Sequence, residues 1–174
     1  MKRFSLINIL LAVLIITCSC SNKETEAFFA GHYALPKIMM KIQDGEAVYE
    51  KTPSDTALYV VWYSRDDCTE CAVKHLEERF GYLWRLQSKV GNFHPMIIMS
   101  PLEENQEQIV ELIKAYAFPW PVYLDLNNEC AEALPANPKF HYFLMNGEGK
   151  PVWLGSPIKD GLIDENFLKK TECL

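Results

Sequence analysis

Cys68 and Cys71, two cysteines separated by two residues, are the side chains in this sequence best suited to chemistry. Thiols at this spacing lie about one helical turn apart, close enough to form a disulfide with each other. A thiolate can also attack the disulfide of another protein, and a second thiol then resolves the mixed disulfide. The spacing therefore indicates thiol–disulfide exchange, with Cys68 as the attacking sulfur and Cys71 as the resolving one.

The residues around this pair predict where it lies. Residues 58–63, LYVVWY, form an unbroken apolar run typical of a buried strand. After a polar turn, apolar residues recur at helical spacing from Cys68 to about Lys89. The cysteines therefore lie where a strand leads into a helix, and the free N–H groups of the first turn favour a thiolate there. Cys71 is expected to lie deeper than Cys68, inside that turn, where neighbouring side chains restrict approach.

The charged residues near Cys68 act on its pKa in opposite directions. Negative charge raises the pKa of a thiol, and positive charge lowers it. Asp66, Asp67 and Glu70 favour the neutral thiol, whereas Arg65 and Lys74 favour the thiolate. If the acids prevail, the reduced pair is less stabilised and the site is a stronger reductant.

A static disulfide and half of a zinc site are the alternative roles for the pair. Zinc requires two further ligands, and the remaining candidates are scattered without a second paired spacing. These candidates are Cys130, Cys173, His75 and His141. We therefore expect neither a metal nor a cofactor.

The first residues have the pattern of an export signal. Lys2 and Arg3 are followed by an apolar stretch over residues 6–16 that is too short to span a membrane. The sequence around Cys18 and Cys20 resembles a bacterial lipobox, and Ser19 is the better fit ahead of a modified cysteine. We therefore predict a lipoprotein signal peptide over residues 1–19, lipidation at Cys20 with Cys18 as the alternative, and a tether over residues 20–34; an ordinary secretory peptide is the other interpretation.

Composition and charge limit the possible partners. The chain has 174 residues, 49% of them hydrophobic, and a formal net charge of −6, which disfavours nucleic acid as a partner. Membrane attachment would come from acyl chains, on the inner or outer membrane of a bacterial envelope and facing the periplasm. Disulfides persist in that compartment, so Cys130 and Cys173 are expected either to pair or to leave Cys130 as a buried apolar residue.

The order of the predicted elements indicates an α/β fold. A hairpin around Asp44-Gly45 precedes the strand at residues 58–63. A strand at residues 93–100, a helix at 103–118, an extended segment at 119–125 and a short helix at 127–134 follow. Strands at residues 140–145 and 151–154 and a helix capped by Asp164 end the chain. We expect a central mixed sheet flanked by helices, with an N-terminal β-hairpin extension.

From about Leu35 to Lys170 the chain resembles the thioredoxin superfamily, in particular its TlpA-like, redoxin branch. The resemblance rests on three features in order: the strand with CTEC at residues 68–71, FPWPVYLD at 118–125, and HYFLMN at 141–146 followed by GKPVWLG at 149–155. It implies a thioredoxin-like domain over residues 35–174. It also implies an oxidoreductase that exchanges disulfides with exported proteins and is recycled by a redox partner; a binding or assembly module with a structural disulfide is the alternative.

The chain departs from the family pattern beside the cysteines. Asp67 stands where an aromatic residue is usual, and Thr69-Glu70 replaces a pair that usually contains proline. The family's groove proline corresponds by counting to Phe140, whereas the nearest proline is Pro138. Arg65 stands where redoxin peroxidases carry Thr or Ser, which excludes that activity. The residues expected to line a substrate groove are Trp62, Asp67, Glu70, Pro138, Phe140 and His141.

Overall fold

The computed structural model describes residues 23–90, 93–159, 162–172 and 174. It divides into two units, Met1–Gly31 and His32–Leu174. In the first unit, residues 23–30 are helical, although they belong to the predicted tether. Lys, Glu and Ala in this stretch favour a helix, and Gly31 ends it. No helix among the described residues is long and apolar enough to cross a membrane.

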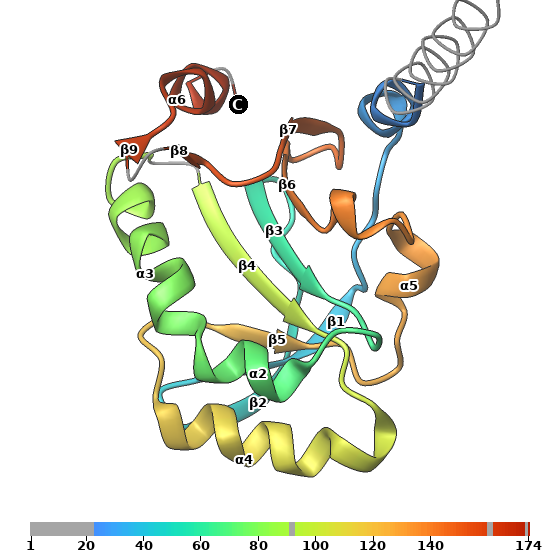
Figure 1. The fold of residues 1–174 in the computed structure, drawn as a ribbon, viewed down its shortest axis with the longest axis vertical. Helices are drawn as coiled ribbons and strands as arrows, with labels where there is room; N and C mark the ends of the chain where they lie inside the picture. The colour runs from blue at the N-terminus through green and yellow to red at the C-terminus, as the bar shows by residue number, and fades with distance from the viewer. Residues whose placement is uncertain (1–22, 91–92, 160–161, 173) are drawn as a thin grey trace, which may run out of the picture. The chain divides into compact units, whose positions relative to one another are not determined.

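The second unit is built on a seven-stranded sheet with the order β2-β1-β5-β4-β3-β6-β7 (Figure 1). Its three central strands are parallel, and the strands on either side of them run antiparallel to their neighbours. The strands are β1 (Ile38–Gln43), β2 (Glu46–Lys51), β3 (Ala57–Tyr63), β4 (Phe93–Met99), β5 (Val122–Leu124), β6 (Tyr142–Met145) and β7 (Pro151–Leu154). A separate two-stranded sheet consists of β8 (Ile158–Lys159) and β9 (Leu162–Ile163).

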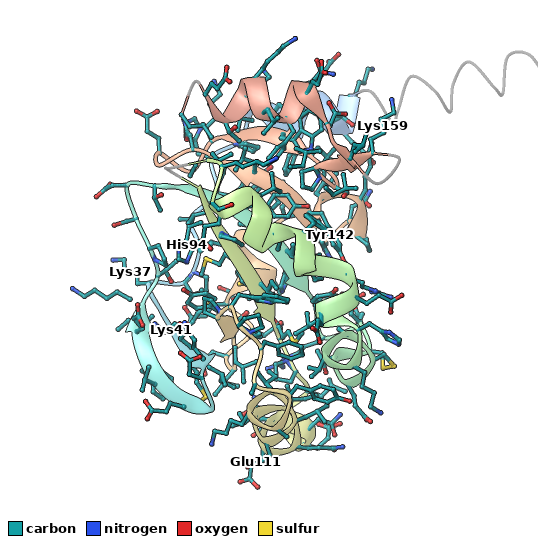
Figure 2. The ribbon with its side chains drawn as sticks, turned by 90° about the vertical axis from the view of Figure 1, so that its left-hand side faces the viewer. Lys37, Lys41, His94, Glu111, Tyr142 and Lys159 are labelled. Atoms are coloured by element: carbon teal, nitrogen blue, oxygen red, sulfur yellow. A yellow bond between two sulfur atoms is a disulfide. The ribbon has the colours of Figure 1, made fainter. Side chains whose placement is uncertain are left out.

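Most helices contribute to one apolar core. They are α2 (Thr69–Lys74), α3 (Leu76–Gln87), α4 (Gln106–Tyr116), α5 (Cys130–Ala133) and α6 (Glu165–Thr171), with 3-10 turns η1 (Glu103–Asn105) and η2 (Pro138–Phe140). Apolar side chains of α2, α3, α4 and α6 join a single cluster with Tyr59 and Val61 of β3. Charged side chains such as Lys37 and Glu111 point into solvent (Figure 2). On the other face of β3, Trp62 contacts His141, the residue that follows η2.

The position of β3 follows from its composition. All seven of its residues are buried, as expected for a strand with neighbours on both sides. It pairs in parallel with β4 and antiparallel with β6. The Asp44-Gly45 hairpin is also confirmed: both turn residues have positive φ, +53° and +79°, and join β1 to β2.

The chain order of the core elements is the thioredoxin arrangement. The order β3-α2-α3-β4-α4-β6-β7-α6 folds into the spatial strand order β4-β3-β6-β7, with β5 and the β1-β2 hairpin added beyond β4. The predicted fold class, a thioredoxin-like mixed sheet flanked by helices and extended by an N-terminal hairpin, is confirmed.

Three of the differences between the predicted and observed element boundaries lie near the cysteines or the late strands. The helix expected from Cys68 to Lys89 is divided at His75, whose N–H bonds to the carbonyl of Ala72. The helix expected at residues 127–134 is the shorter α5. The late strand begins at Tyr142, because Pro138 and the Asn137 side chain, which accepts the Lys139 N–H, favour a 3-10 turn before it.

Candidate active site

The predicted dithiol lies where the sequence placed it, at the start of α2 directly after β3. Cys68 and Cys71 form a disulfide, with Cα atoms 5.2 Å apart. Cys68 is the N-cap residue of α2, and its Sγ accepts a hydrogen bond from the Cys71 N–H at 3.3 Å. In the reduced state the same N–H group would stabilise a Cys68 thiolate, because it and the helix dipole both favour negative charge there.

Both cysteines are exposed. We expected Cys71 to lie deeper than Cys68, and its exposure corrects this expectation. Accessibility therefore does not distinguish the two thiols. The preference for Cys68 as the nucleophile rests on its N-cap position and on the hydrogen bond that it accepts.

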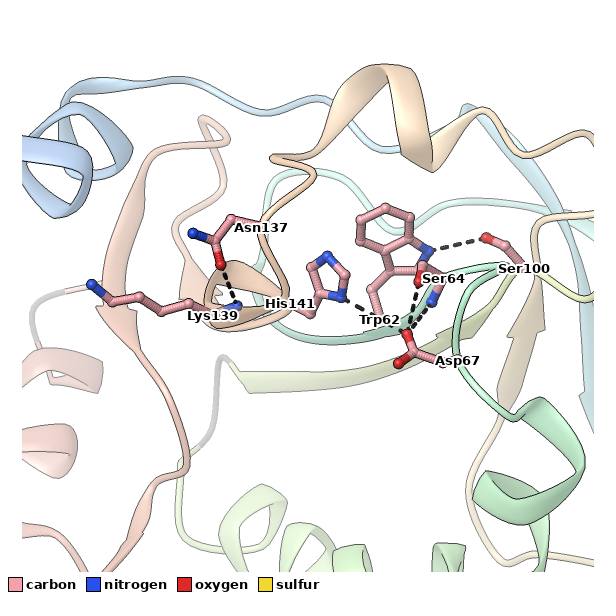
Figure 3. A network of polar contacts seen from close by, with 7 residues as sticks. All are labelled: Trp62, Ser64, Asp67, Ser100, Asn137, Lys139 and His141. Atoms are coloured by element: carbon pink, nitrogen blue, oxygen red, sulfur yellow. Dashed lines mark hydrogen bonds and ion pairs between the residues drawn. The ribbon is translucent and has the colours of Figure 1, made fainter. Parts of the chain in front are cut away.

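The acidic residues around Cys68 have different partners. Oδ2 of Asp67 accepts hydrogen bonds from the Ser64 N–H and the Ser64 hydroxyl, both at 2.8 Å (Figure 3). Glu70 pairs with Lys74 one turn further along α2, at 2.6 Å, and both side chains are exposed. Arg65 donates from Nη2 to the carbonyl of Leu126 at 3.2 Å. Only part of the predicted acidic charge is therefore left unpaired beside Cys68.

Trp62 and His141 form the buried side of the site. Their ring centroids are 4.3 Å apart, and Nδ1 of His141 lies 4.0 Å from Oδ2 of Asp67. Burial lowers the pKa of His141, and the negative charge of Asp67 opposes this shift. The structure thus brings together three of the predicted groove residues, Trp62, Asp67 and His141.

The other predicted groove residues lie differently. Glu70 points to Lys74, Phe140 is buried, and Pro138 is exposed at the start of η2. His141, and neither Pro138 nor Phe140, directly precedes β6. The described residues contain no cis peptide bond.

A series of hydrogen-bonded buried side chains supports Trp62, and the sequence analysis did not predict it. Nε1 of Trp62 donates to Oγ of Ser100 at 3.0 Å, and Ser100 donates to Oδ2 of Asp125, also at 3.0 Å. Asp125 further accepts the N–H groups of Glu129 and Cys130. Ser100 and Asp125 each directly follow an apolar strand, β4 and β5. A polar residue at the carboxyl end of a parallel strand is the signal that could have indicated them.

A pocket of about 200 Å³ opens beside Cys68. Its far wall comes from η1, α4 and the residue before them: Leu102, Asn105, Gln108 and Ile109. Nothing in the sequence near the cysteines indicates these residues, because the fold brings them there from more than 30 positions away. Leu102 is 42% exposed and offers an apolar contact at the rim.

Cys130 is the remaining cysteine within the described residues, and its thiol lies outside this site. Cys130 is fully buried and forms no disulfide with another described cysteine, and burial together with the charge of Asp125 raises the pKa of its thiol. Cys173, Cys18 and Cys20 lie outside the described residues, so the Cys130–Cys173 pairing and the lipidation site stay predictions. Within the part of the chain that the structure describes, no cluster of three or more His, Cys, Asp or Glu side chains could hold a metal ion.

Comparison with known proteins gives only distant likenesses. No family model and no curated protein matches the chain. The similar solved structures include a thioredoxin-like protein from Porphyromonas gingivalis, a protein from Bacteroides thetaiotaomicron proposed to be a protein disulfide isomerase, and AhpC from Enterococcus faecalis.

The Porphyromonas gingivalis structure has 19% identity and a TM-score of 0.46, over 82% of this chain and 92% of the other. The Bacteroides thetaiotaomicron structure has 16% identity and a TM-score of 0.45, over 82% of this chain and 86% of the other. The AhpC structure has 14% identity and a TM-score of 0.40, over 81% of this chain and 89% of the other. The strand order of the chain itself, and not these distant likenesses, establishes that it has a thioredoxin-like fold with a CxxC disulfide at the start of its first core helix.

Proposed function

We propose that this protein is a thiol–disulfide oxidoreductase that acts on exported proteins. The observation that carries the proposal is the exposed Cys68–Cys71 disulfide at a helix N-terminus, with Cys68 Sγ accepting a helix N–H. An exposed disulfide is open to attack by other thiols, and the N-cap position stabilises the thiolate that its reduction releases.

The reaction requires only the two sulfurs and a substrate disulfide. The Cys68 thiolate attacks one substrate sulfur, the substrate S–S bond breaks, and the second substrate sulfur leaves as a thiolate. The Cys71 thiolate then attacks Cys68 Sγ, which re-forms the Cys68–Cys71 bond and releases the other substrate thiolate. Two electrons pass from the protein to the substrate, and the reverse sequence oxidises a substrate dithiol.

The alternative, a binding module whose disulfide is structural, is less well supported by the geometry. A structural disulfide stabilises most when it closes a long loop. This one joins residues three apart within a single helical turn and is not buried in the core. Its contribution to stability through loop closure is therefore small, which favours a redox role.

Measuring the reduction potential of the Cys68–Cys71 pair tests the proposal. A value well below about −300 mV would identify the bond as structural, whereas a value nearer about −270 mV, that of thioredoxin, supports exchange. The same preparation is tested for reduction of a model protein disulfide with a dithiol as electron source. If the protein does not accelerate that reduction, the proposed oxidoreductase activity is rejected.

Trapping with single-cysteine variants tests which sulfur attacks. We expect Cys71→Ser to accumulate mixed disulfides with substrate proteins, because the intermediate at Cys68 can no longer be resolved. Cys68→Ser is the matched control and should trap few. The reverse pattern would assign the attack to Cys71.

We further propose that the protein is anchored by lipid at Cys20 in a bacterial envelope, on the periplasmic side of the inner or outer membrane. The lipobox-like residues 16–22 after an apolar stretch support this proposal. A lipid anchor would hold the exposed disulfide in an oxidising compartment, where protein disulfides are the available substrates.

A further inference from the structure

His141 occupies a position from which it can act on the reactive cysteine through a neighbour. It is only 3% exposed and directly precedes β6. Its carbonyl accepts the Trp62 N–H at 2.9 Å, which joins it to β3, and its ring lies against the Trp62 indole at a tilt of 48° (Figure 3). The ring is therefore held beside the turn that leads from β3 to Cys68.

The groups that face this ring come from three elements. The turn after β3 contributes the carboxylate of Asp67, 4.0 Å from Nδ1. β3 contributes the uncharged indole of Trp62, and the segment before η2 contributes the carbonyls of Pro135 and Ala136, which favour the protonated ring. Among the described residues, Nε2 makes no hydrogen bond of normal geometry. Asp67 is thus the charged group whose interaction with His141 is strengthened when the ring takes up a proton.

Asp67 connects His141 to the chemistry, because it is the residue directly before Cys68. The Ser64 N–H and hydroxyl fix its carboxylate in the turn. When His141 is neutral, the negative charge of Asp67 opposes ionisation of the adjacent thiol. A proton on His141 balances the charge of Asp67, so that the Cys68 thiol ionises more readily.

We propose that the charge on His141 sets, through Asp67, how readily Cys68 ionises. His141 is then a positioning residue for the proposed exchange reaction, on which this inference rests. The coupling is reciprocal: a thiolate at Cys68 favours a proton on His141 to the same extent that this proton favours the thiolate.

This coupling changes how Cys68 responds to acid. Burial lowers the pKa of His141, so its ring is neutral near pH 7 and becomes charged only on acidification. At pH values where His141 is protonated, the Cys68 thiolate is stabilised. The reactivity of Cys68 then declines less steeply with falling pH than that of an ordinary thiol. The plot of reactivity against pH should then have two inflections.

The test measures ionisation of Cys68 directly. The reduced full-length protein is alkylated between about pH 4.5 and about pH 9, and modification of the Cys68 peptide is quantified by mass spectrometry. We expect two inflections in the unaltered protein and one in His141→Asn. At the acidic end the unaltered protein should react faster by about threefold or more.

A double-variant cycle tests the route through Asp67. If the effect runs through this carboxylate, His141→Asn changes nothing further in an Asp67→Asn background. Superimposable curves for the unaltered protein and His141→Asn would overturn the inference. An equal effect of His141→Asn in both backgrounds would overturn it as well, because His141 would then act by another route.

An NMR titration of His141 in the unaltered protein covers the case in which His141→Asn does not fold. The ring should show an additional titration step in the reduced protein that follows ionisation of Cys68 and is absent from the oxidised protein. Identical titrations in the two forms would reject the coupling.

These measurements require no turnover and so separate the inference from the proposed function. If His141 and Cys68 ionise in a coupled way but the protein exchanges no disulfides, the inference stands and the proposed enzymatic activity is rejected. If the protein exchanges disulfides but the two ionisations are independent, the activity stands and the inference is rejected.

Discussion

Asp67 and Glu70 carry the same charge within three residues of each other, but their partners differ. Glu70 is paired with Lys74 on the exposed side of α2, whereas Asp67 lies in the turn against Ser64 and faces His141. A paired, exposed carboxylate contributes little to the potential at a neighbouring sulfur, because its partner and solvent both screen it. Asp67 therefore opposes the Cys68 thiolate more strongly than Glu70 does.

We expect Asp67→Asn to lower the pKa of Cys68 by roughly half a unit to one unit, because asparagine keeps the acceptor for Ser64 but removes the charge. Glu70→Gln is the matched control and should change the pKa much less. Alkylation rate against pH at low and high salt measures both, and salt should reduce the Asp67 effect. An equal shift in the two variants would show that the ion pair with Lys74 does not neutralise Glu70.

Hydrogen bonds between buried side chains link the carboxyl ends of the three parallel strands. Trp62 belongs to β3, Ser100 follows β4, and Asp125 follows β5. Asp125 also accepts two N–H groups at the start of α5, so one carboxylate holds a helix and two strands together. The strand ends that carry the disulfide depend on these hydrogen bonds for their alignment.

Asp125→Ala should lower the free energy of unfolding by about 2 to 4 kcal/mol, because it leaves several buried donors without an acceptor. Ser100→Ala, which removes only the bridging hydroxyl, should cost about 1 to 2 kcal/mol. Urea unfolding of the oxidised proteins measures both values, and exposed Glu111→Ala on α4 serves as the control. A smaller loss in Asp125→Ala than in Ser100→Ala would contradict the central role of the carboxylate.

The buried His141 and the half-buried His94 link the stability of the protein to pH. Burial lowers the pKa of both His141 and His94. The unfolded chain therefore binds protons as pH falls through about 6.5, whereas the folded protein does not until its own lower pKa values are reached. Stability contributed by the neutral rings is present above the unfolded value and is lost as pH falls toward the folded values.

We expect the free energy of unfolding to decrease from about pH 7.5 to about pH 5.5, a range above the titration of most carboxylates. The decrease should be smaller in His141→Asn, because the buried ring of residue 141 is no longer there to titrate. Urea unfolding at several pH values measures the slope. An unchanged slope would mean that His141 has the same pKa in the folded and unfolded states.

The anchor also concerns the molecule as a whole. We expect cells grown with labelled palmitate to label the protein, and Cys20→Ala to abolish that label while Cys18→Ala retains it. Both variants keep the rest of the export signal, so each controls for the other. Loss of label in Cys18→Ala alone would assign the lipid to Cys18, and no label in any form would reject the anchor.

Local features were readable from the sequence because they depend on neighbours along the chain. The apolar run at residues 58–63, the change to helical spacing after it, and the Asp44-Gly45 turn together specify the strand, the cysteines at the helix start and the hairpin. The distribution of charge at the site required the tertiary structure. Asp67 meets His141, and Trp62 meets Ser100 and Asp125, only because β4 and β6 flank β3 and bring residues from distant parts of the chain to one edge of the sheet. Spacing in the sequence determines which residues share a face, whereas the strand order decides which faces meet.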